Sequence, residues 1–383
     1  MKISATAPVL LALLTFSVAN AQVVRPLPPP TASGRTFGQF INASGVAVGY
    51  TGSNIVYRPA IWRPSGSTYV YEALPLPPGN VDGVANSIGA GGVIAGYSQP
   101  NDQSTATATV WTAPPAGAYA ATLLPSPLDS TLTSAYAINA TGSVGGFRET
   151  ATGHTDAVVW EPLGPAYSAT MLPALSGWVD TAATAINDNG DLAGYSFAAL
   201  GGPRGAVWKK TPSGYVAKDV IAAADDVVIT AINNFGIGAG VLDGDQAAVM
   251  VEFEGEYYAG ELSTPFDTSS AANAVNNADA LVGYVKQGSF AAALWLPGDD
   301  EWELVNLDDW LNRTNPSLGN QWVLEEATGI TDNWLVTGQG FFGATRVPRG
   351  FVLDVSSLVP EPSGVFALIG GPLLILRRRR RRS

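Results

Sequence analysis

Four pairs of adjacent carboxylates are the residues best suited by type to acid–base chemistry. They are Asp225-Asp226, Asp299-Asp300, Asp308-Asp309 and Glu325-Glu326. Glycoside cleavage needs two carboxyl groups about 5–9 Å apart on one sugar. Adjacent strand residues point to opposite faces, so no pair makes such a site by itself. We expect these acids in solvated loops. A glycan-active hydrolase or lyase, which would use acidic residues brought together on one rim of the fold, is the alternative function.

Metal and thiol chemistry is limited by composition. The chain has no cysteine and one histidine, His154, in a T-G-H-T-D segment typical of an exposed loop. Cys-ligated metals, thiol catalysis and multi-histidine metal sites are therefore excluded, and we expect no cofactor. Asn187-Asp188-Asn189-Gly190-Asp191 is similar to part of a calcium loop, but it lacks the bidentate Glu at the EF-hand spacing. We therefore predict no metal site.

The body of the chain is an internal repeat with the core A-x-A-I-N-x-x-G-x-x-x-G-Y. Seven copies are spaced 43 to 55 residues apart, with their Ile or Val at Ile41, Ile88, Ile138, Ile186, Ile232, Val275 and Ile330. Asparagine follows in five of them, at Asn42, Asn139, Asn187, Asn233 and Asn276. These amides could line a site in a ring, or each could satisfy the backbone of its own turn. We favour the turn role.

Each repeat unit predicts four short strands. The first ends at Ile-Asn, the glycine turn follows, and the second ends at Gly-Tyr. The third carries a tryptophan in five copies, and the fourth runs from a tyrosine to Leu-Pro. The tryptophans are Trp62, Trp111, Trp160, Trp208 and Trp295. Four strands in about 45–50 residues is the size of one propeller blade, so we predict an all-β, seven-bladed β-propeller over 22–357.

The seventh repeat ends near Val355 without a fourth strand. The N-terminal segment from Gln22 to Pro28 reads as a fourth strand with its own Leu-Pro ending, so we expect it to complete the seventh blade and close the ring. A helix is expected only near Leu304 to Leu311.

Irregular residues are better candidates for binding than repeated ones. Trp178 and Trp322 both lie eight residues before the Ile of their repeat, where the other repeats lack tryptophan. This offset predicts a common rim, shared with the long insert from Asp308 to Glu326. There the two rings would stack on sugars, or they would cap the edges of their blades, which is the reading we favour.

Both ends of the chain carry export signals. Residues 1–21 read as a secretory signal peptide, with Lys2, an apolar stretch and the cleavage site Ala19-Asn20-Ala21. At the other end, Pro360-Glu361-Pro362 precedes a 13-residue apolar run from Gly364 to Leu376. A basic cluster follows, which would stop transfer and stay in the cytoplasm: Arg377, Arg378, Arg379, Arg380, Arg381 and Arg382.

The segment 358–383 resembles the PEP-CTERM sorting signal of Gram-negative bacteria, with all three parts in order. That resemblance implies transient anchoring in the inner membrane, recognition by an exosortase-type enzyme and removal of the tail. A plain C-terminal anchor is the alternative. The repeat resembles the HAF family of bacterial extracellular repeats, over most of Phe37 to Val355. The resemblance to these repeats implies an extracellular location, and it assigns no residue a chemical role.

The charge of the body excludes one class of partner. Without Lys2 and the six tail arginines, 13 basic residues face 32 acidic ones, a net charge of about −19. Nucleic-acid binding needs clustered basic residues and is therefore not expected. We expect an exported, non-enzymatic propeller at the cell surface or outside the cell, which binds exopolysaccharide or envelope proteins. An envelope scaffold without a glycan ligand is a third reading.

Overall fold

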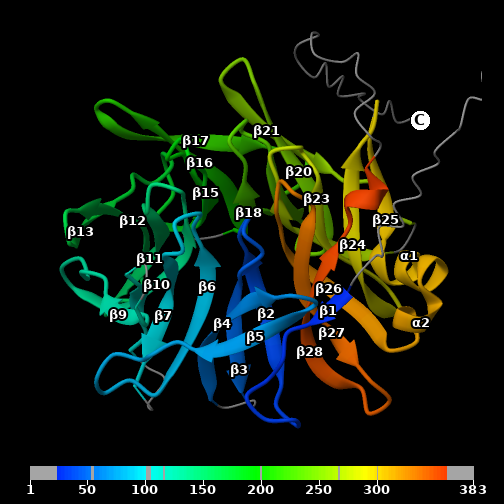
Figure 1. Ribbon diagram of the computed structural model, residues 1–383. Helices are drawn as coiled ribbons and strands as arrows, with labels where there is room; N and C mark the ends of the chain where they lie inside the picture. Colours follow the sequence, from blue (N-terminus) through cyan, green and yellow to red (C-terminus); the bar gives the residue numbers. More distant parts are fainter. Residues whose placement is uncertain are drawn as a thin grey trace, which may run out of the picture.

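The computed structural model describes residues 24–52, 56–100, 105–114, 117–198, 201–265, 268–299 and 301–359. Within these ranges the chain forms 28 strands, two short α-helices and one 3-10 turn (Figure 1). The prediction of an all-β chain is therefore confirmed. Successive strands pair antiparallel in units of four, as the repeat predicts.

The strands have the same order in every repeat unit. The first strands are β2 (Thr36–Ile41), β6 (Asp82–Ile88), β10 (Ser130–Ile138), β14 (Asp180–Ile186), β18 (Val227–Ile232), β22 (Ser269–Val275) and β26 (Trp322–Ile330). The second strands are β3 (Ala47–Gly52), β7 (Ile94–Gln99), β11 (Val144–Thr150), β15 (Leu192–Phe197), β19 (Gly238–Leu242), β23 (Leu281–Gln287) and β27 (Leu335–Phe342).

The two outer positions of each unit complete the sheets. The third strands are β4 (Tyr57–Ser65), β8 (Thr107–Thr112), β12 (Thr155–Leu163), β16 (Pro203–Thr211), β20 (Gln246–Phe253), β24 (Ser289–Pro297) and β28 (Val347–Asp354). The fourth strands are β5 (Thr68–Ala73), β9 (Ala120–Leu123), β13 (Ala166–Met171), β17 (Gly214–Ile221), β21 (Glu256–Glu261) and β25 (Trp302–Asn306).

These strands form five four-stranded sheets and one eight-stranded sheet. The larger sheet consists of β14–β17 and β18–β21, joined edge to edge by a short parallel pairing of Val220 with Tyr257 and Ile221 with Tyr258. The N-terminal strand β1 (Val24–Pro26) pairs antiparallel with β28, with Val24 opposite Leu353. Figure 1 shows the blue β1 beside the orange-red β28.

Every first strand carries a bulge at the same position, and this explains the second glycine of the repeat. In β14 the register shifts between Ala183 and Ala185, opposite Gly194. A Cβ on Gly194 would lie 2.0 Å from the carbonyl oxygen of Ala182. The equivalent distance is 1.9 to 2.4 Å in the other units, at Gly49, Gly96, Gly146, Gly240, Gly283 and Gly338. Only glycine lets the two strands approach this closely.

The first glycine of the repeat has a different role. Gly190 has φ +86° in the turn between β14 and β15, in the left-handed region that glycine enters without a steric penalty. In the last two units Asp279 and Trp334 hold this position with φ 61° and 65°. The turn is therefore kept where the sequence has lost the glycine.

The hydrophobic core lies between sheets that are consecutive in the chain. One cluster joins Val48 and Ile61 of the first unit to Ile88, Ile94 and Trp111 of the second. A single four-stranded sheet would leave these side chains exposed, so each unit depends on its neighbours for burial.

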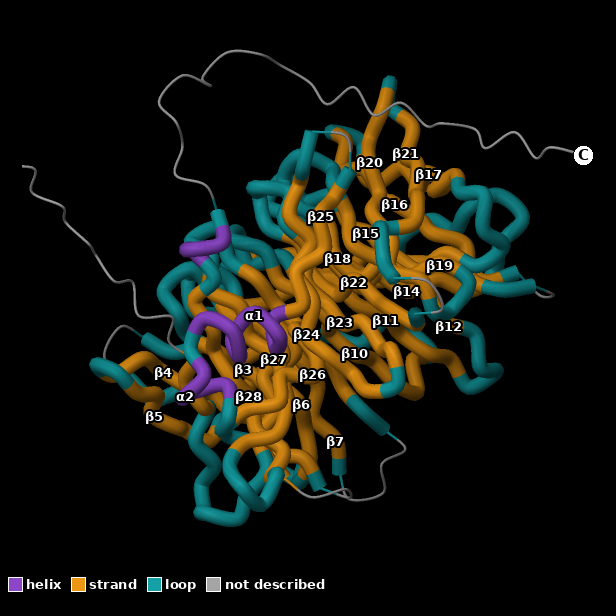
Figure 2. The backbone as a smooth tube through the Cα atoms, turned by 90° about the vertical axis from the view of Figure 1, so that its right-hand side faces the viewer, coloured by secondary structure: helices purple, strands orange, loops and turns teal. Residues whose placement is uncertain are grey.

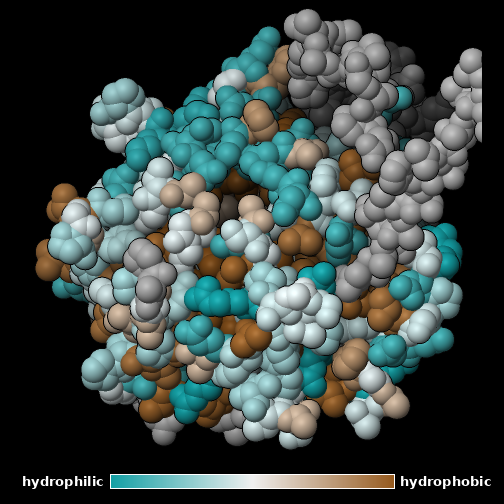
Figure 3. All heavy atoms as spheres, in the orientation of Figure 1, coloured by the Kyte–Doolittle hydropathy of each residue, from teal (hydrophilic) through white to brown (hydrophobic). Residues whose placement is uncertain are grey.

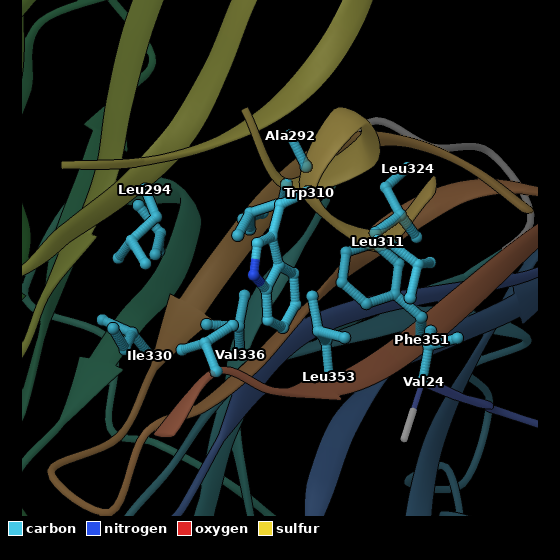
Figure 4. Packing of buried hydrophobic residues seen from close by; sticks show 14 of the residues in the cluster. Val24, Ala292, Leu294, Trp310, Leu311, Leu324, Ile330, Val336, Phe351 and Leu353 are labelled. Carbon is cyan, nitrogen blue, oxygen red and sulfur yellow. The ribbon is translucent and has the colours of Figure 1, made fainter. Parts of the chain in front are cut away.

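The expected helix is found, shifted by three residues. Trp302–Asn306 form β25, and α1 spans Leu307–Thr314, followed by α2 (Pro316–Gly319). Figure 2 shows the two helices side by side. Trp310 and Leu311 of α1 pack into a cluster with Val24, Phe351 and Leu353 (Figure 4). None of the described helices is long and apolar enough to cross a membrane, and the apolar run of the tail lies outside the described residues.

Candidate functional site

A cavity of about 230 Å³ lies where the first strands end, and all seven repeat units line it. The last residue of each first strand lines it, together with Phe40, and also packs into the core between the sheets. We call these residues the aliphatic floor: Ile41, Ile88, Ile138, Ile186, Ile232, Val275 and Ile330. The next residue of each unit forms an amide ring: Asn42, Gly89, Asn139, Asn187, Asn233, Asn276 and Thr331. The residue after that forms a collar: Ala43, Ala90, Ala140, Asp188, Asn234, Asn277 and Asp332. Equivalent residues of every unit thus meet around one axis.

Each buried asparagine of the amide ring makes two kinds of hydrogen bond, one within its own turn and one to the next repeat unit. The side-chain oxygen of Asn187 accepts the backbone N–H of Asp191, 2.9 Å away, and so closes its own turn. Its Nδ2 donates to the backbone oxygen of Asn233 in the next unit, at 3.0 Å. Asn42, Asn139, Asn233 and Asn276 repeat both contacts. The turn role we favoured is confirmed, and the ring of amides around a cavity is present as well.

The collar residues also form hydrogen bonds from one repeat unit to the next, from the third unit to the seventh. Each side chain accepts a hydrogen bond from the collar N–H of the preceding unit. Asp188 accepts from Ala140 at 2.8 Å, and Asp332 accepts from Asn277 at 2.7 Å. The pairs Asp188 with Asn234 and Asn234 with Asn277 are bonded likewise. The collar side chains are therefore held in fixed orientations.

A further polar belt lies at the bulges of the first strands. The bulged side chains of Asn86, Thr230 and Thr328 donate to backbone oxygens of the next sheet, at 2.7, 2.7 and 2.9 Å. The bond from Thr328 reaches Gly38, so it joins the last repeat unit to the first. Most recurrent polar residues thus bind sheet to sheet.

Partly exposed tyrosines surround the axis farther along the same strands. We call Tyr50, Tyr97, Tyr136, Tyr195 and Tyr284 the aromatic mouth. Four of them are the tyrosine of the Gly-Tyr motif, and they pair across to the first strand four residues before its Ile or Val. Tyr136 comes from the bulge of β10, is 38% exposed and stacks on Phe147 with ring centroids 5.7 Å apart.

The tyrosines of the aromatic mouth influence one another across sheets. Burial raises the pKa of Tyr97 to about 12, and Asp82 and the hydroxyls of Tyr57, Tyr50 and Tyr136 also oppose its ionisation. Burial likewise raises the pKa of Tyr136, with a contribution from Tyr195. Hydroxyls from four consecutive units therefore lie within electrostatic range of one another.

One carboxylate belongs to the same end of the axis. Glu326 accepts hydrogen bonds from the amides of Asn273 and Gln339. Its charge adds to burial in raising the pKa values of Tyr50, to about 12, and of Tyr284. The aromatic mouth thus offers rings, neutral phenols and one oriented carboxylate. In the space-filling view, hydrophobic side chains show in the recesses between hydrophilic ones (Figure 3).

The expected rim of two tryptophans is not formed. Trp322 is 3% exposed and packs against Phe342 and Phe351, so its ring is not available for stacking. It is buried because the helical insert covers the start of β26. Trp178 is half-buried against the core between the third and fourth units, as expected of a cap on a sheet edge.

The remaining sequence candidates lie in separate places. The side chain of His154 is 61% exposed, as expected, with Nδ1 3.2 Å from Asp180. Asp225 is exposed, as expected, whereas burial raises the pKa of Asp308, which accepts the N–H of Leu324. Asp299 is exposed, and its neighbour Asp300 lies outside the described residues. The calcium-like segment forms the turn after β14, and the described residues hold no metal-binding cluster of His, Cys, Asp or Glu.

The sorting residues fall outside the structural description. Pro360, Glu361 and Pro362, the basic cluster from Arg377 to Arg382, and residues 1–21 all lie outside the described residues. Their roles stay predictions.

Comparison with solved structures decides the fold. YCF48 bound to D1 peptide aligns at a TM-score of 0.51 and 14% identity, over 90% of this chain and 98% of that one. The β-propeller domain of Cps50 (Swd1) from Myceliophteria thermophila aligns at 0.53 and 10% identity, over 87% and 100%. This chain is a β-propeller. A puromycin hydrolase mutant with PGG aligns at 0.52 and 14% identity, over 83% of this propeller and 52% of that chain.

At these identities the likeness extends to the fold alone. No protein-family model and no curated protein matches the sequence. The propeller's function must therefore be argued from its own residues.

The aromatic mouth was missed by reasoning from the sequence. Its signal was the tyrosine of Gly-Tyr, which recurs at the end of the second strand. Small or medium-sized residues, Val84, Ala182 and Ala271, lie opposite three of these tyrosines. Together they leave room for a ring to stay partly exposed at the axis.

Proposed function

We propose that this chain is an exported, exosortase-processed, non-enzymatic β-propeller that binds polysaccharide at its aromatic mouth. The observation that carries the proposal is the set of five partly exposed tyrosines, contributed by separate sheets to one end of the axis. Aromatic rings with a few fixed polar groups are typical of ligand sites. Sugar rings offer C–H faces for the aromatic rings, and their hydroxyls suit the phenols and Glu326.

We further propose that the propeller has seven blades and that the N-terminal segment closes its ring. On this view the eight-stranded sheet is two blades that touch through β17 and β21. The pairing of β1 with β28 supports closure, as do the hydrogen bonds from Thr328 to Gly38 and from Asn333 to Ala43. A closed ring leaves no long strand edge open to aggregation.

Export and sorting rest on the sequence signals at both ends. The resemblance to the PEP-CTERM signal supports cleavage near Pro360-Glu361-Pro362 by an exosortase-type enzyme, after transient anchoring in the inner membrane. Mass spectrometry of the mature C-terminus from native cells tests this. The sorting proposal requires a product without Arg377 to Arg382, found in the medium or at the cell surface. An intact tail would contradict it.

Binding is tested with a glycan array followed by calorimetry on the glycans retained. We expect Tyr136→Ala and Tyr195→Ala each to weaken binding roughly tenfold, because each removes one stacking ring. Phe253→Ala is the matched control, since Phe253 is 56% exposed on the outer strand β20, away from the mouth. Unchanged affinity in both tyrosine variants, or equal loss in the control, would contradict the proposed site.

A specific observation supports a second candidate function, a glycan-active hydrolase. The register of β26 shifts between Leu324 and Glu326, so Glu325 sits in a bulge beside Glu326. Such a bulge re-aims side chains and relaxes the strict alternation of a strand. Burial and the neighbouring Glu326 raise the pKa of Glu325, as a general acid requires.

The two functions are separated by turnover. A hydrolase releases reducing sugar from exopolysaccharide, and Glu325→Gln would abolish that release while binding is kept. A binding propeller retains the glycan and releases nothing.

A further inference from the structure

The cavity at the collar is a second site with its own ligand chemistry. Tyr195 pairs with Ala182, six residues before Asp188, which places the collar roughly 20 Å along the strand from the aromatic mouth. We propose that this cavity binds a small amphipathic ammonium ion, with an apolar body on the aliphatic floor and the charged group at the collar. The proposal does not depend on the function assigned to the mouth.

The size and lining of the cavity set the size of the ligand. A volume of about 230 Å³ is below the 300–1,000 Å³ typical of drug-sized ligands, so it suits a single ring or a short aliphatic chain. The aliphatic floor, Phe40 and the collar alanines give the cavity an apolar lining, and apolar burial is the main favourable term for such a ligand.

The collar is itself two-sided, and this orients the ligand. Ala43, Ala90 and Ala140 form its apolar arc, on the first three repeat units. Asp188, Asn234, Asn277 and Asp332 form its polar arc, on the last four. An amphipathic molecule seated on the floor would therefore turn its charged group toward the acids and amides of the collar, and the apolar part that reaches the collar would lie against the alanines.

The charge of the polar arc selects a cation. Asp188 and Asp332 are exposed carboxylates, and no residue that lines the cavity is basic. Each carboxylate accepts two hydrogen bonds in the collar, Asp188 from Ala140 and Asn234, and Asp332 twice from Asn277. A carboxylate offers about four lone-pair sites, so acceptor capacity remains for an ammonium group. The existing bonds hold both carboxylates in place before the ligand arrives.

Three probes of one shape test the charge. Calorimetry on the purified protein would compare 2-phenylethylammonium, neutral 2-phenylethanol and anionic 3-phenylpropionate. We expect the ammonium to bind roughly three- to tenfold more tightly than the alcohol, and the carboxylate to bind most weakly. The alkylammonium of Nα-acetyl-lysine amide tests the same chemistry on a peptide, and a preference for it would assign the site to a lysine side chain of a partner protein.

Variants locate the binding. Asp188→Asn and Asp332→Asn each keep one acceptor oxygen, which serves the backbone N–H of Ala140 or Asn277, and lose the bond from the side-chain amide of Asn234 or Asn277. They are expected to remove the preference for ammonium over alcohol and to retain alcohol binding, because the apolar lining is unchanged. Ala90→Trp fills the exposed apolar arc and is expected to abolish binding of all probes. Ser44→Trp, on an exposed turn residue outside the lining, is its control and is expected to bind normally.

Three results would overturn the proposal: equal affinity for ammonium and carboxylate, normal binding by Ala90→Trp, or no binding of any probe at millimolar concentration. Tyr136→Ala is expected to leave collar binding unchanged, so failure here and failure of the glycan proposal are distinguishable.

Discussion

The indole N–H of Trp62 donates a hydrogen bond to the carbonyl oxygen of Pro28, 2.8 Å away and 34 residues earlier in the chain. The same bond joins Trp111 to Pro75, Trp160 to Pro125 and Trp208 to Pro173. Pro75, Pro125 and Pro173 are each the proline of the Leu-Pro pair that follows the fourth strand of the preceding repeat unit. The N-terminal segment therefore occupies, before the first unit, the place that a fourth strand occupies before the others.

Substitution of Leu27 tests how much the N-terminal segment contributes to stability. Leu27 is fully buried, and its N–H donates to Gly350 at 2.8 Å, as Leu124 and Leu172 donate within their own sheets. We expect Leu27→Ala to lower the free energy of unfolding by about 3 kcal/mol, through lost burial and a cavity. Urea unfolding measures this. Val216→Ala, at a position 46% exposed on β17, is the control and should change stability little. An equally small effect at Leu27 would contradict closure by the N-terminus.

Gly194 tests the close approach at the bulge. A Cβ there would lie 2.0 Å from the Ala182 carbonyl oxygen, so Gly194→Ala must displace a strand next to the axis. We expect a loss of about 3 kcal/mol in thermal or urea unfolding. Gly260→Ala on β21 is the matched control, because a Cβ there has no atom within 4 Å. Similar stability in the two variants would show that the bulge accommodates a side chain.

Asn187 tests the amide ring. Asn187→Ala would leave the Asp191 N–H and the Asn233 carbonyl without their buried partner, and we expect a loss of about 2 to 3 kcal/mol. Asn187→Asp keeps the acceptor for the turn but removes the donor to the next sheet. Its unfolding, measured beside that of the alanine variant, separates the two roles. Asn189→Ala, at an exposed turn position, is expected to cost much less.

From the raised pKa values of tyrosines in the aromatic mouth, we expect the free energy of unfolding to fall at high pH. Burial raises the pKa values of Tyr50 and Tyr97 from 10.0 to about 12, so the folded protein favours their neutral phenols. This contribution to stability is complete below pH 10 and is lost as the pH rises toward 12, because the unfolded chain ionises first. Phenolate absorbance and circular dichroism, followed together, measure it. Tyr50→Phe should flatten the loss, and ionisation of all tyrosines near pH 10 in the folded protein would contradict the prediction.

Much of the fold could be predicted from periodic residues. Glycine at the turn and at the bulge is required by backbone geometry inside one unit. Trp208 in the third strand and Leu172 at the end of the fourth are required by packing between one unit and the next. Such requirements recur in each repeat unit, so the residues that meet them recur at a fixed spacing in the sequence. The helix expected near Leu304 to Leu311 is also found, over Leu307–Thr314.

The candidate sites were harder to predict because they depend on several units at once. Trp322 was expected at a rim, but the insert that carries α1 folds over it and buries it. Tyr97 was expected only as the last residue of a second strand, whereas its neighbours come from the units before and after its own. Neither environment can be inferred from spacing along the chain.

The sequence by itself determined the repeat, its four strands and the turn that each asparagine closes, because these are governed by contacts within about 50 residues. It also predicts export, from the residues at both ends. Only the tertiary structure decided which rings stay exposed and that alanines and carboxylates divide the collar into two arcs. Those features arise because equivalent positions of successive units, some 45 positions apart in the chain, meet around one axis. The exposure of a side chain there depends on neighbours from other units.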